Sequence, residues 1–448
     1  MEAVLKPDGR KRKRYTWEYA DLPPIRKEPH ITTIKDYMTS LNFQLIGYSD
    51  GIARFSFVQT WEDLKEKIEP TYKPYLKGNR KIRKLVSELT GSITAEADIV
   101  ETLFHFVRDS IETSRYRGYW GNGIRGPGAL LSSGHGSRVE KNLLLVSLLR
   151  TAGLNAEPLL ISTRANGRLD TRNPRADSFN HLLVFMGRPA KFRLLDASDP
   201  FCPITLLPAN YLTNTGWLIL TGDSDGLVTI PAPNSLSAKF ATIDSARIDS
   251  TGNLEGQITI RYEGYRGIRY RRLLAESKTE RKFIEEEVFD IFNNAEIDTF
   301  QVLRAEKKES PLVVIARFRI PGFAEVAGDK IYFSPALFQR FQENQFRLEK
   351  RTYPVEYNFP SMDQEMITFE LPANYAIIEA PQNIDWKIRG QEFRRLLTRN
   401  ADGRLNYYRN LHIAKVYYSP VEYEMLKNFT TYIVEADGDQ LVLQRQSN

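Results

Sequence analysis

The sequence contains very little cysteine and histidine, and this restricts the chemistry that it can support. Cys202 is the single cysteine among 448 residues, so no disulfide can form within the chain. Of the five histidines, His30, His105 and His412 lie far apart and show none of the close spacing of metal ligands. We therefore expect no metal site and no cofactor.

Long apolar runs and nucleotide-binding motifs are also missing. No apolar run approaches the roughly 20 residues needed to cross a bilayer, so we expect no transmembrane segment. There is no zinc-finger spacing, no aromatic RNA-binding strand motif and no glycine-rich phosphate loop. Much of the net charge of +6 comes from the basic run at residues 6–14, which is typical of a solvated segment. We expect no nucleic-acid partner.

The composition that remains is that of a folded globular protein. Hydrophobic residues make up 42% and charged residues 26%, over a length that suggests two or three domains. Residues 1–60 are irregular and punctuated by proline, apart from a strand-like alternation at residues 42–46. Pro70 and Pro74 predict a turn between the first two helices. The helices expected from amphipathic spacing cover residues 61–69, 79–89 and 94–113.

The strongest local signal is a helix at residues 137–153. Ser137 and Glu140 have the S-x-x-E spacing of a capping box, in which each side chain bonds an amide of the first turn. The residues that follow are apolar almost all round the helix, and Gly153 can adopt the left-handed conformation that ends it. We therefore expect a central, buried helix.

The rest of the sequence is predicted to be mainly β, which makes the fold class α+β. Residues 157–162 form one expected strand, and residues 181–185 and 192–195 form an expected hairpin. Residues 231–448 are expected to form an antiparallel β-sandwich domain, interrupted by one helix at residues 279–293. The strands expected in this domain include residues 256–262, 312–319, 366–371 and 430–436.

Within the predicted hairpin, His181 and Asp196 are equidistant from the midpoint between Arg188 and Pro189. A symmetric loop would place them directly opposite each other, on one face of the sheet. Opposed Cβ atoms lie about 5 Å apart, so the carboxylate could accept a hydrogen bond from the imidazole. This arrangement depends on the register of the hairpin.

These segments resemble a known family. Residues 136–145 (GSRVEKNLLL) resemble the helix of a transglutaminase-like domain that carries its catalytic cysteine. Residues 160–164 (LISTR) and 179–181 (FNH) resemble the next strand and the histidine strand, and residues 194–200 (LLDASDP) resemble the aspartate strand. The resemblance implies a cysteine-proteinase-type core of helices packed on an antiparallel sheet, which we assign to residues 61–230.

The flanking regions resemble those of bacterial, mostly Bacteroidetes-type, multidomain proteins, in which one β domain precedes the core and another follows it. This implies that residues 1–60 are the tail of an N-terminal β domain and a linker. The resemblance suggests the periplasm or cell envelope if a signal peptide has been removed. If residue 1 is the natural start, the lack of an apolar signal core favours the cytoplasm.

Applied to this sequence, the resemblance makes His181 the general base and Asp196 the residue that orients it. The position of the nucleophile falls on Arg138, or on Ser137 after a shift of one residue, and neither is a cysteine. Cys202 follows the aspartate strand and is expected to be a small packing residue. The catalytic residues that remain are therefore interpreted as vestigial.

Two further residues are candidates for contact with a ligand. Trp120 could form a wall of the cleft or serve as a packing anchor. His135 lies in a glycine-rich loop just before the helix at residues 137–153, where it could line the cleft or face solvent.

Three functions are compatible with these patterns. The leading interpretation is a non-enzymatic binding or scaffolding protein whose groove takes a peptide, protein, polyamine or glycan. The alternative is an active transglutaminase-like peptidase or acyltransferase that uses Ser137, or Cys202, with His181 and Asp196. A third is a cell-envelope structural module whose β domains make the interaction.

Overall fold

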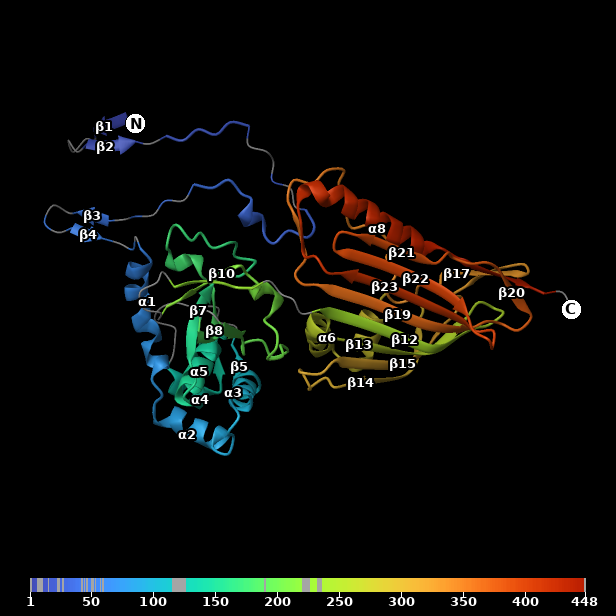
Figure 1. Ribbon diagram of the computed structural model, residues 1–448, viewed down its shortest axis with the longest axis horizontal. Helices are drawn as coiled ribbons and strands as arrows, with labels where there is room; N and C mark the ends of the chain where they lie inside the picture. The colour runs from blue at the N-terminus through green and yellow to red at the C-terminus, as the bar shows by residue number, and fades with distance from the viewer. Residues whose placement is uncertain are drawn as a thin grey trace.

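The computed structural model describes most of the chain. Figure 1 shows two bodies, which we call the helical lobe (residues 60–231) and the β lobe (residues 236–446). No helix in the described part of the chain is long and apolar enough to cross a membrane. The described residues are 60–114, 126–188, 191–219, 226–231 and 236–446, together with 2–5, 11–14, 16–21, 25, 28–41, 43, 45, 47–49, 52, 54–56 and 58.

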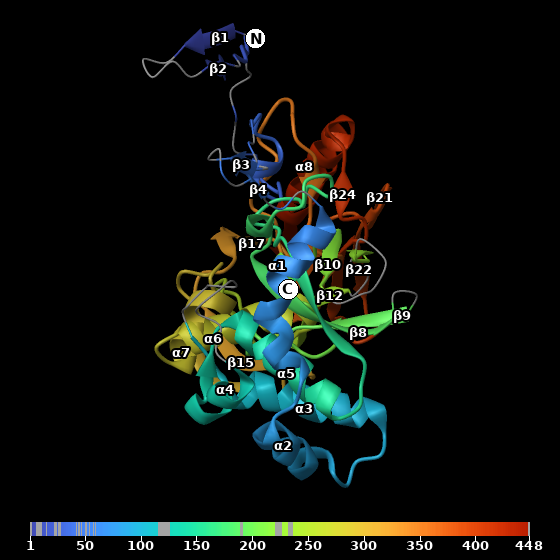
Figure 2. The same cartoon turned by 90° about the vertical axis from the view of Figure 1, so that its left-hand side faces the viewer.

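Five helices cover one face of a sheet in the helical lobe, and Figure 2 shows them from their own side. The first helix continues through Pro70 and Pro74, so the turn expected there is wrong. Its buried side chains, which include Leu64, Ile68 and Tyr72, form one stripe at helical spacing, and this packing outweighs the helix-breaking effect of proline. The helices are α1 Trp61–Leu76, α2 Arg80–Thr90, α3 Glu96–Ser110, α4 Pro127–Ser133 and α5 Arg138–Thr151.

Helix α5 is the centre of this lobe, as the sequence predicts. It contacts the other four helices and strands β7 and β8, and all its residues from Val139 to Leu149 are buried. Both halves of the capping box are present: the Ser137 hydroxyl accepts from the Glu140 amide at 3.2 Å, and the Glu140 carboxylate accepts from the Ser137 amide at 2.7 Å. The start of α5 is therefore fixed by local bonds as well as by packing.

The sheet of the helical lobe has five strands in the order β11-β10-β7-β8-β9, and every pairing is antiparallel. The expected hairpin is present, but its register is wrong by two residues. Leu195 pairs with Val184, whereas the symmetric loop predicted Leu182 as its partner. A shift of two leaves side chains on the same face. The strands are β7 Ala156–Ile161, β8 His181–Arg188, β9 Lys191–Leu195, β10 Thr215–Leu218 and β11 Leu227–Thr229.

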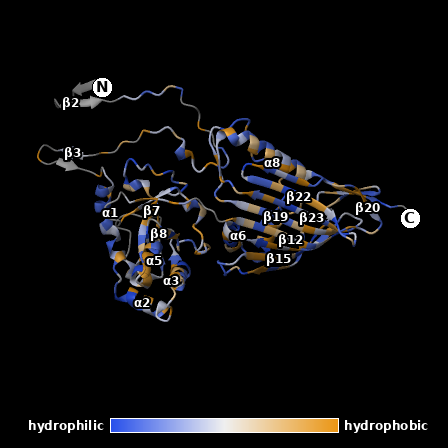
Figure 3. Cartoon of the chain, viewed as in Figure 1, coloured by the Kyte–Doolittle hydropathy of each residue, from blue (hydrophilic) through white to orange (hydrophobic). Residues whose placement is uncertain are grey.

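The β lobe contains an eight-stranded sheet in the order β14-β15-β13-β12-β19-β23-β22-β21. The β12–β19 pair is parallel, which corrects the expectation of a wholly antiparallel sandwich. Figure 3 shows hydrophobic and hydrophilic residues alternating along these strands. The strands are β12 Ser237–Ile248, β13 Leu254–Tyr262, β14 Glu296–Leu303, β15 Leu312–Ile320, β19 Ser361–Glu370, β21 Ile384–Ile388, β22 Gln391–Arg399 and β23 Leu405–Ile413.

One face of this sheet is covered by a smaller sheet and by helices. Ile331 and Leu443 of the four-stranded sheet β16-β17-β25-β20 share a core with Ile258 and Phe369 of the large sheet. The result is a two-layered, sandwich-like core. The covering elements are β16 Glu325–Ala327, β17 Lys330–Phe333, β20 Tyr375–Glu379, β25 Leu441–Arg445, α6 Gly264–Glu276, α7 Glu280–Phe283 and α8 Tyr423–Gly438.

Helix α8 overturns the strand expected at residues 430–436. Its β-branched residues favour a strand locally. However, Leu426, Phe429, Ile433 and Ala436 are buried at helical spacing, and the last three pack on the large sheet. The helix expected at residues 279–293 is shorter than predicted, because α7 passes into a single π-helical turn at Ile284–Val288.

The chain before residue 60 contributes two small hairpins and a segment that contacts both lobes. Thr32 and Tyr37 donate to the Glu356 carboxylate of the β lobe at 2.5 and 2.9 Å, and Arg168 of the helical lobe donates to the same carboxylate at 3.1 Å. The strand expected at residues 42–46 falls partly outside the described residues. The remaining short strands are β1 Glu2–Leu5, β2 Lys11–Arg14, β3 Gly47–Ser49, β4 Arg54–Ser56, β5 Glu112–Thr113, β6 His135–Gly136, β18 Val355–Glu356 and β24 Tyr417–Tyr418.

Candidate functional site

His181 and Asp196 form a buried hydrogen-bonded pair at the end of the sheet next to α5. Nε2 of His181 lies 2.6 Å from Oδ2 of Asp196, and the two side chains are 4% and 0% exposed. The predicted contact is confirmed, although Asp196 follows the last paired residue of β9 instead of facing His181 in register. Because a carboxylate only accepts hydrogen bonds, Nε2 carries the proton of this contact. In the uncharged form of the ring, Nδ1 is an acceptor.

Asp196 is held by three further donors. Asn142 of α5 donates to Oδ2 at 3.0 Å, while the Ser198 amide and hydroxyl donate to Oδ1 at 2.8 and 2.5 Å. Burial alone would raise the pKa of Asp196, but His181 and the two hydrogen bonds from Ser198 hold it below its ordinary value. The carboxylate is therefore fixed in position and ionised.

Asn142 is a site residue that sequence reasoning missed. Its side-chain amide also donates to the Leu182 carbonyl at 2.7 Å, and its side-chain oxygen accepts from the Ala197 amide at 2.9 Å. Asn142 thus links α5 to β8, which carries His181, and to the segment directly after β9, which carries Asp196. A signal was present, because Asn142 lies four residues after Arg138 and shares that face of the helix.

The first turn of α5 holds the two residues predicted at the nucleophile position. The Ser137 hydroxyl is engaged as the helix cap. Arg138 donates from Nη1 to the Tyr211 hydroxyl at 2.7 Å. Tyr211 in turn stacks on His181, with ring centroids 3.9 Å apart. The sequence contains no signal for Tyr211, because it reaches the site from a short helical turn that lies 30 residues after His181.

These residues line a cavity of about 850 Å³ between the lobes. Arg272 of α6 in the β lobe donates to Asp199 of the helical lobe at 2.6 Å, so an ion pair crosses the cavity wall. Burial raises the pKa of Tyr211 to about 12, with Asp196 adding to the effect, so its hydroxyl is neutral at physiological pH. The lining consists of Thr113, Ser114, Ser137, Arg138, Val139, Thr163, Asn180, His181, Ser198, Asp199, Pro200, Phe201, Asn210, Tyr211, Arg272 and Glu276.

The other sequence candidates lie elsewhere. Cys202 is fully buried in an apolar cluster with Leu212 and two residues of α6, and its thiol faces the Leu206 carbonyl at 3.3 Å. Burial raises the pKa of this thiol well above its ordinary value. His135 is exposed and donates to the Ser133 carbonyl at 2.9 Å, away from the described cavity lining. Trp120 lies outside the described residues.

A buried lysine lies one turn along α5 from the cavity. Lys141 is 1% exposed and donates to the Arg108 carbonyl at 3.1 Å and to the Thr113 hydroxyl at 3.2 Å. Burial lowers its pKa to about 8, although Asp196 and other carboxylates act in the opposite direction. The Lys141 ammonium therefore loses its proton at a lower pH than an exposed lysine does.

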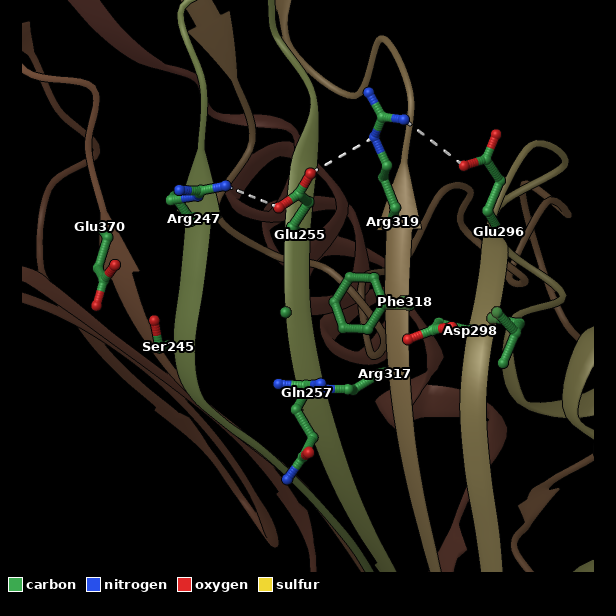
Figure 4. Close-up of a pocket in the computed structure, with 12 residues that line it drawn as sticks. Ser245, Arg247, Glu255, Gln257, Glu296, Asp298, Arg317, Phe318, Arg319 and Glu370 are labelled. Atoms are coloured by element: carbon green, nitrogen blue, oxygen red, sulfur yellow. Dashed lines mark hydrogen bonds and ion pairs between the residues drawn. The ribbon is translucent and has the colours of Figure 1, made fainter.

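A second cavity, of about 760 Å³, lies on the large sheet (Figure 4). Its charges are arranged in an alternating chain, in which Arg247 contacts Glu255 at 3.0 Å, and Arg319 contacts Glu255 at 3.6 Å and Glu296 at 3.9 Å. All four side chains are more than 40% exposed, so these ion pairs contribute little to stability. Within the described part of the chain there is no cluster of three or more residues suited to hold a metal.

Comparison with known proteins supports the architecture. A family model for a domain of unknown function with a solved structure (DUF3858) matches residues 329–443, within the β lobe. No curated protein matches the chain significantly. The chain is similar to a crystal structure described as that of "a putative protease from Parabacteroides distasonis ATCC 8503", with a TM-score of 0.51 and 13% identity.

This similarity covers 91% of the chain but 64% of the solved protein, so the chain spans somewhat less than two thirds of its length. At such low identity the likeness concerns the fold alone. The chain therefore has a mixed α+β fold, with several antiparallel sheets, that is shared with a protease-like protein.

Proposed function

We propose that this chain is a non-catalytic peptide-binding module built on a degenerate transglutaminase-like core, with the cavity between the lobes as its binding groove. The proposal rests on the contacts made by the residues at the start of α5. There the Ser137 hydroxyl caps the helix and the Arg138 guanidinium bonds Tyr211. The position that the family resemblance gives to a thiol nucleophile is therefore filled by an arginine.

The groups at the start of α5 oppose acyl transfer. General-base catalysis requires a nucleophile whose proton His181 can take, and a guanidinium, which is not a nucleophile, stands at that position. The one thiol of the chain, at Cys202, is buried with a raised pKa and does not belong to the described cavity lining. The buried His181–Asp196 pair is then a structural link between strands and helix that also forms a polar wall.

The lining favours a peptide over a glycan. Sugar rings commonly stack on exposed aromatic faces, but Tyr211 is 3% exposed and already stacks on His181. Phe201 is covered by Arg272, whose guanidinium lies 5.9 Å from the ring centroid. The Nδ1 atom of His181 offers an acceptor to a main-chain N–H, which a peptide supplies in every residue.

Covalent probes test the absence of catalysis. The chain would be treated with a fluorophosphonate and with iodoacetamide, beside Ser137→Asn and His181→Ala variants. Asparagine keeps the helix cap but removes the hydroxyl, so it separates chemistry from folding. We expect no labelling that depends on His181, and no ammonia release or cleavage with glutamine-containing peptides. Labelling that disappears in both variants would overturn the proposal.

Blocking the groove tests the binding role. Pro200 is exposed and lines the cavity between the lobes, so Pro200→Trp should fill part of it and weaken peptide retention. Gln257→Trp is a matched control, because Gln257 is exposed and lines the second cavity instead (Figure 4). Equal effects of the two substitutions would place binding outside the groove.

The alternative function is a serine-dependent peptidase or acyltransferase. The observation in its favour is that Ser137 and His181 line the same cavity, with Asp196 behind His181. Fluorophosphonate labelling of Ser137 that is lost in His181→Ala would support this alternative. Iodoacetamide labelling of Cys202 with the same dependence would support a thiol mechanism.

A further inference from the structure

We infer that the groove anchors its peptide by a carboxylate group, which binds Arg138 at the start of α5. The inference rests on the proposed peptide-binding function and adds to it the chemical group that is recognised. Three features support it: the charge of Arg138, the buried edge of His181, and the main-chain amides of the first turn.

The charge of Arg138 is not neutralised by any described carboxylate within 4 Å. The described hydrogen bond of its side chain goes to Tyr211, whose hydroxyl is neutral. Asp196 and Asp199 act on Arg138 at longer range, but each has its own partner. Asp196 is bonded to His181, and Asp199 to Arg272 at 2.6 Å. The guanidinium therefore brings to the groove a positive charge that no described ion pair engages, with donors left for a bidentate carboxylate contact.

His181 provides a buried polar atom on the same groove. The residue is 3% exposed and lines the cavity, and its Nε2 is engaged with Asp196. No described residue bonds Nδ1. An acceptor in this position suits a peptide N–H close to the anchored carboxylate.

The first turn of α5 adds main-chain donors. The Glu140 amide is taken by the Ser137 hydroxyl and the Lys141 amide by the Ser137 carbonyl. Among the described residues, no acceptor bonds the amides of Arg138 and Val139, and both of these residues line the groove. The helix has 14 residues, so its dipole further favours an anion at this end.

The β lobe supplies the opposite charge. Glu276, the last residue of α6, is exposed, lines the groove and makes no described ion pair. It would repel a ligand that is wholly acidic but attract a basic group on the same ligand. The groove therefore fits a dipolar peptide, with a carboxylate at Arg138 and a lysine, arginine or amino terminus near Glu276.

The test uses three pools of synthetic heptapeptides on the immobilised full chain. The first pool has free C-terminal carboxylates, the second has C-terminal amides, and the third has amides and contains no Asp or Glu. Peptides retained on the protein are quantified by mass spectrometry. We expect the third pool to be retained about tenfold less than the best of the other two, which is the loss that removing one charge-assisted contact gives. The first two pools show whether the carboxylate is terminal or belongs to a side chain.

Two variants test whether Arg138 is responsible for the preference for carboxylate-bearing peptides. Arg138→Gln should abolish the advantage of carboxylate-bearing peptides, whereas Arg193→Gln, at an exposed arginine of β9 outside the described lining, should leave it unchanged. Far-UV circular dichroism and the unfolding midpoint control for folding of Arg138→Gln. Equal retention of the three pools, or an unchanged preference in Arg138→Gln, would overturn the inference alone. Retention of no pool, or recovery of cleaved peptides, would overturn the proposed function as well.

Discussion

The buried Lys141 gives the most direct test of the electrostatics around the groove. Its ammonium is enclosed by protein, bonds two oxygens that carry no formal charge, and makes no described ion pair. Burial lowers its pKa from 10.5 to about 8. A shift of this size corresponds to roughly 3 kcal/mol between the charged and neutral forms, at about 1.4 kcal/mol for each pH unit.

The sign of the effect follows from proton binding in the two states. Below pH 8 the lysine is charged in both the folded and the unfolded chain, so the full burial penalty applies. Between pH 8 and 10.5 the folded chain releases the proton first, and the free energy of unfolding rises with pH. From pH 7 to pH 9 the gain from this group should be about 1 kcal/mol.

Lys141→Met removes the charge and keeps most of the side-chain volume. The hydrogen bonds to Arg108 and Thr113 are lost, but at a cost that does not depend on pH in this range. The free energy of unfolding of the wild type minus that of the variant should therefore rise by about 1 kcal/mol from pH 7 to pH 9. Urea unfolding at pH 7, 8 and 9 measures it.

Lys84→Met is the matched control, because the Lys84 side chain is 77% exposed and should show no such trend. A difference between wild type and Lys141→Met that stays constant within about 0.3 kcal/mol would refute the reasoning. It would mean that the charge of Lys141 is already compensated in the folded chain.

Three further predictions concern other buried groups. Arg409 and Asp437 form a fully buried ion pair, and Asp437→Asn leaves the guanidinium without its counter-charge. The substitution should therefore destabilise the β lobe by about 3–5 kcal/mol in chemical denaturation. A loss below about 1 kcal/mol would contradict this prediction. Ser137→Ala should cost about 1 kcal/mol in the same assay and Ser137→Asn only a few tenths, since asparagine also caps helices, whereas equal costs would deny the capping role. The lowered pKa of Asp196 stabilises the fold above about pH 4, and this stabilisation is lost as the pH falls. The difference in unfolding free energy between wild type and Asp196→Asn should therefore shrink from about pH 5 to about pH 3, as measured by unfolding at a series of acid pH values. A constant difference would mean that the carboxylate is not ionised in the folded chain.

Local sequence determined helix α5 and the β8–β9 hairpin. The capping box and the all-round apolar character of α5 are properties of adjacent residues, so they could be read without knowing the rest of the fold. The contact between His181 and Asp196 survived a register error of two residues, because strand side chains repeat with a period of two. The catalytic, vestigial and binding roles assigned to these residues stay predictions.

Tertiary packing overrode the local sequence in other elements. Pro70 and Pro74 are tolerated in α1 because its buried stripe packs on α5. The β-branched residues of α8 form a helix because Phe429, Ile433 and Ala436 then share one face against the large sheet. In both segments long-range burial outweighs local propensity, which sequence patterns measure alone.

The sequence by itself determined the α+β class, the central capped helix, the lack of a disulfide and the residues at the start of α5. Only the tertiary structure decided that Arg138 bonds Tyr211, that Cys202 is buried away from the described cavity lining, and that Arg272 and Glu276 complete the groove. The physical reason is sequence distance. A cap or a strand period involves residues within a few positions, whereas the walls of the groove come from several segments between residues 113 and 276, brought together by packing of the two lobes.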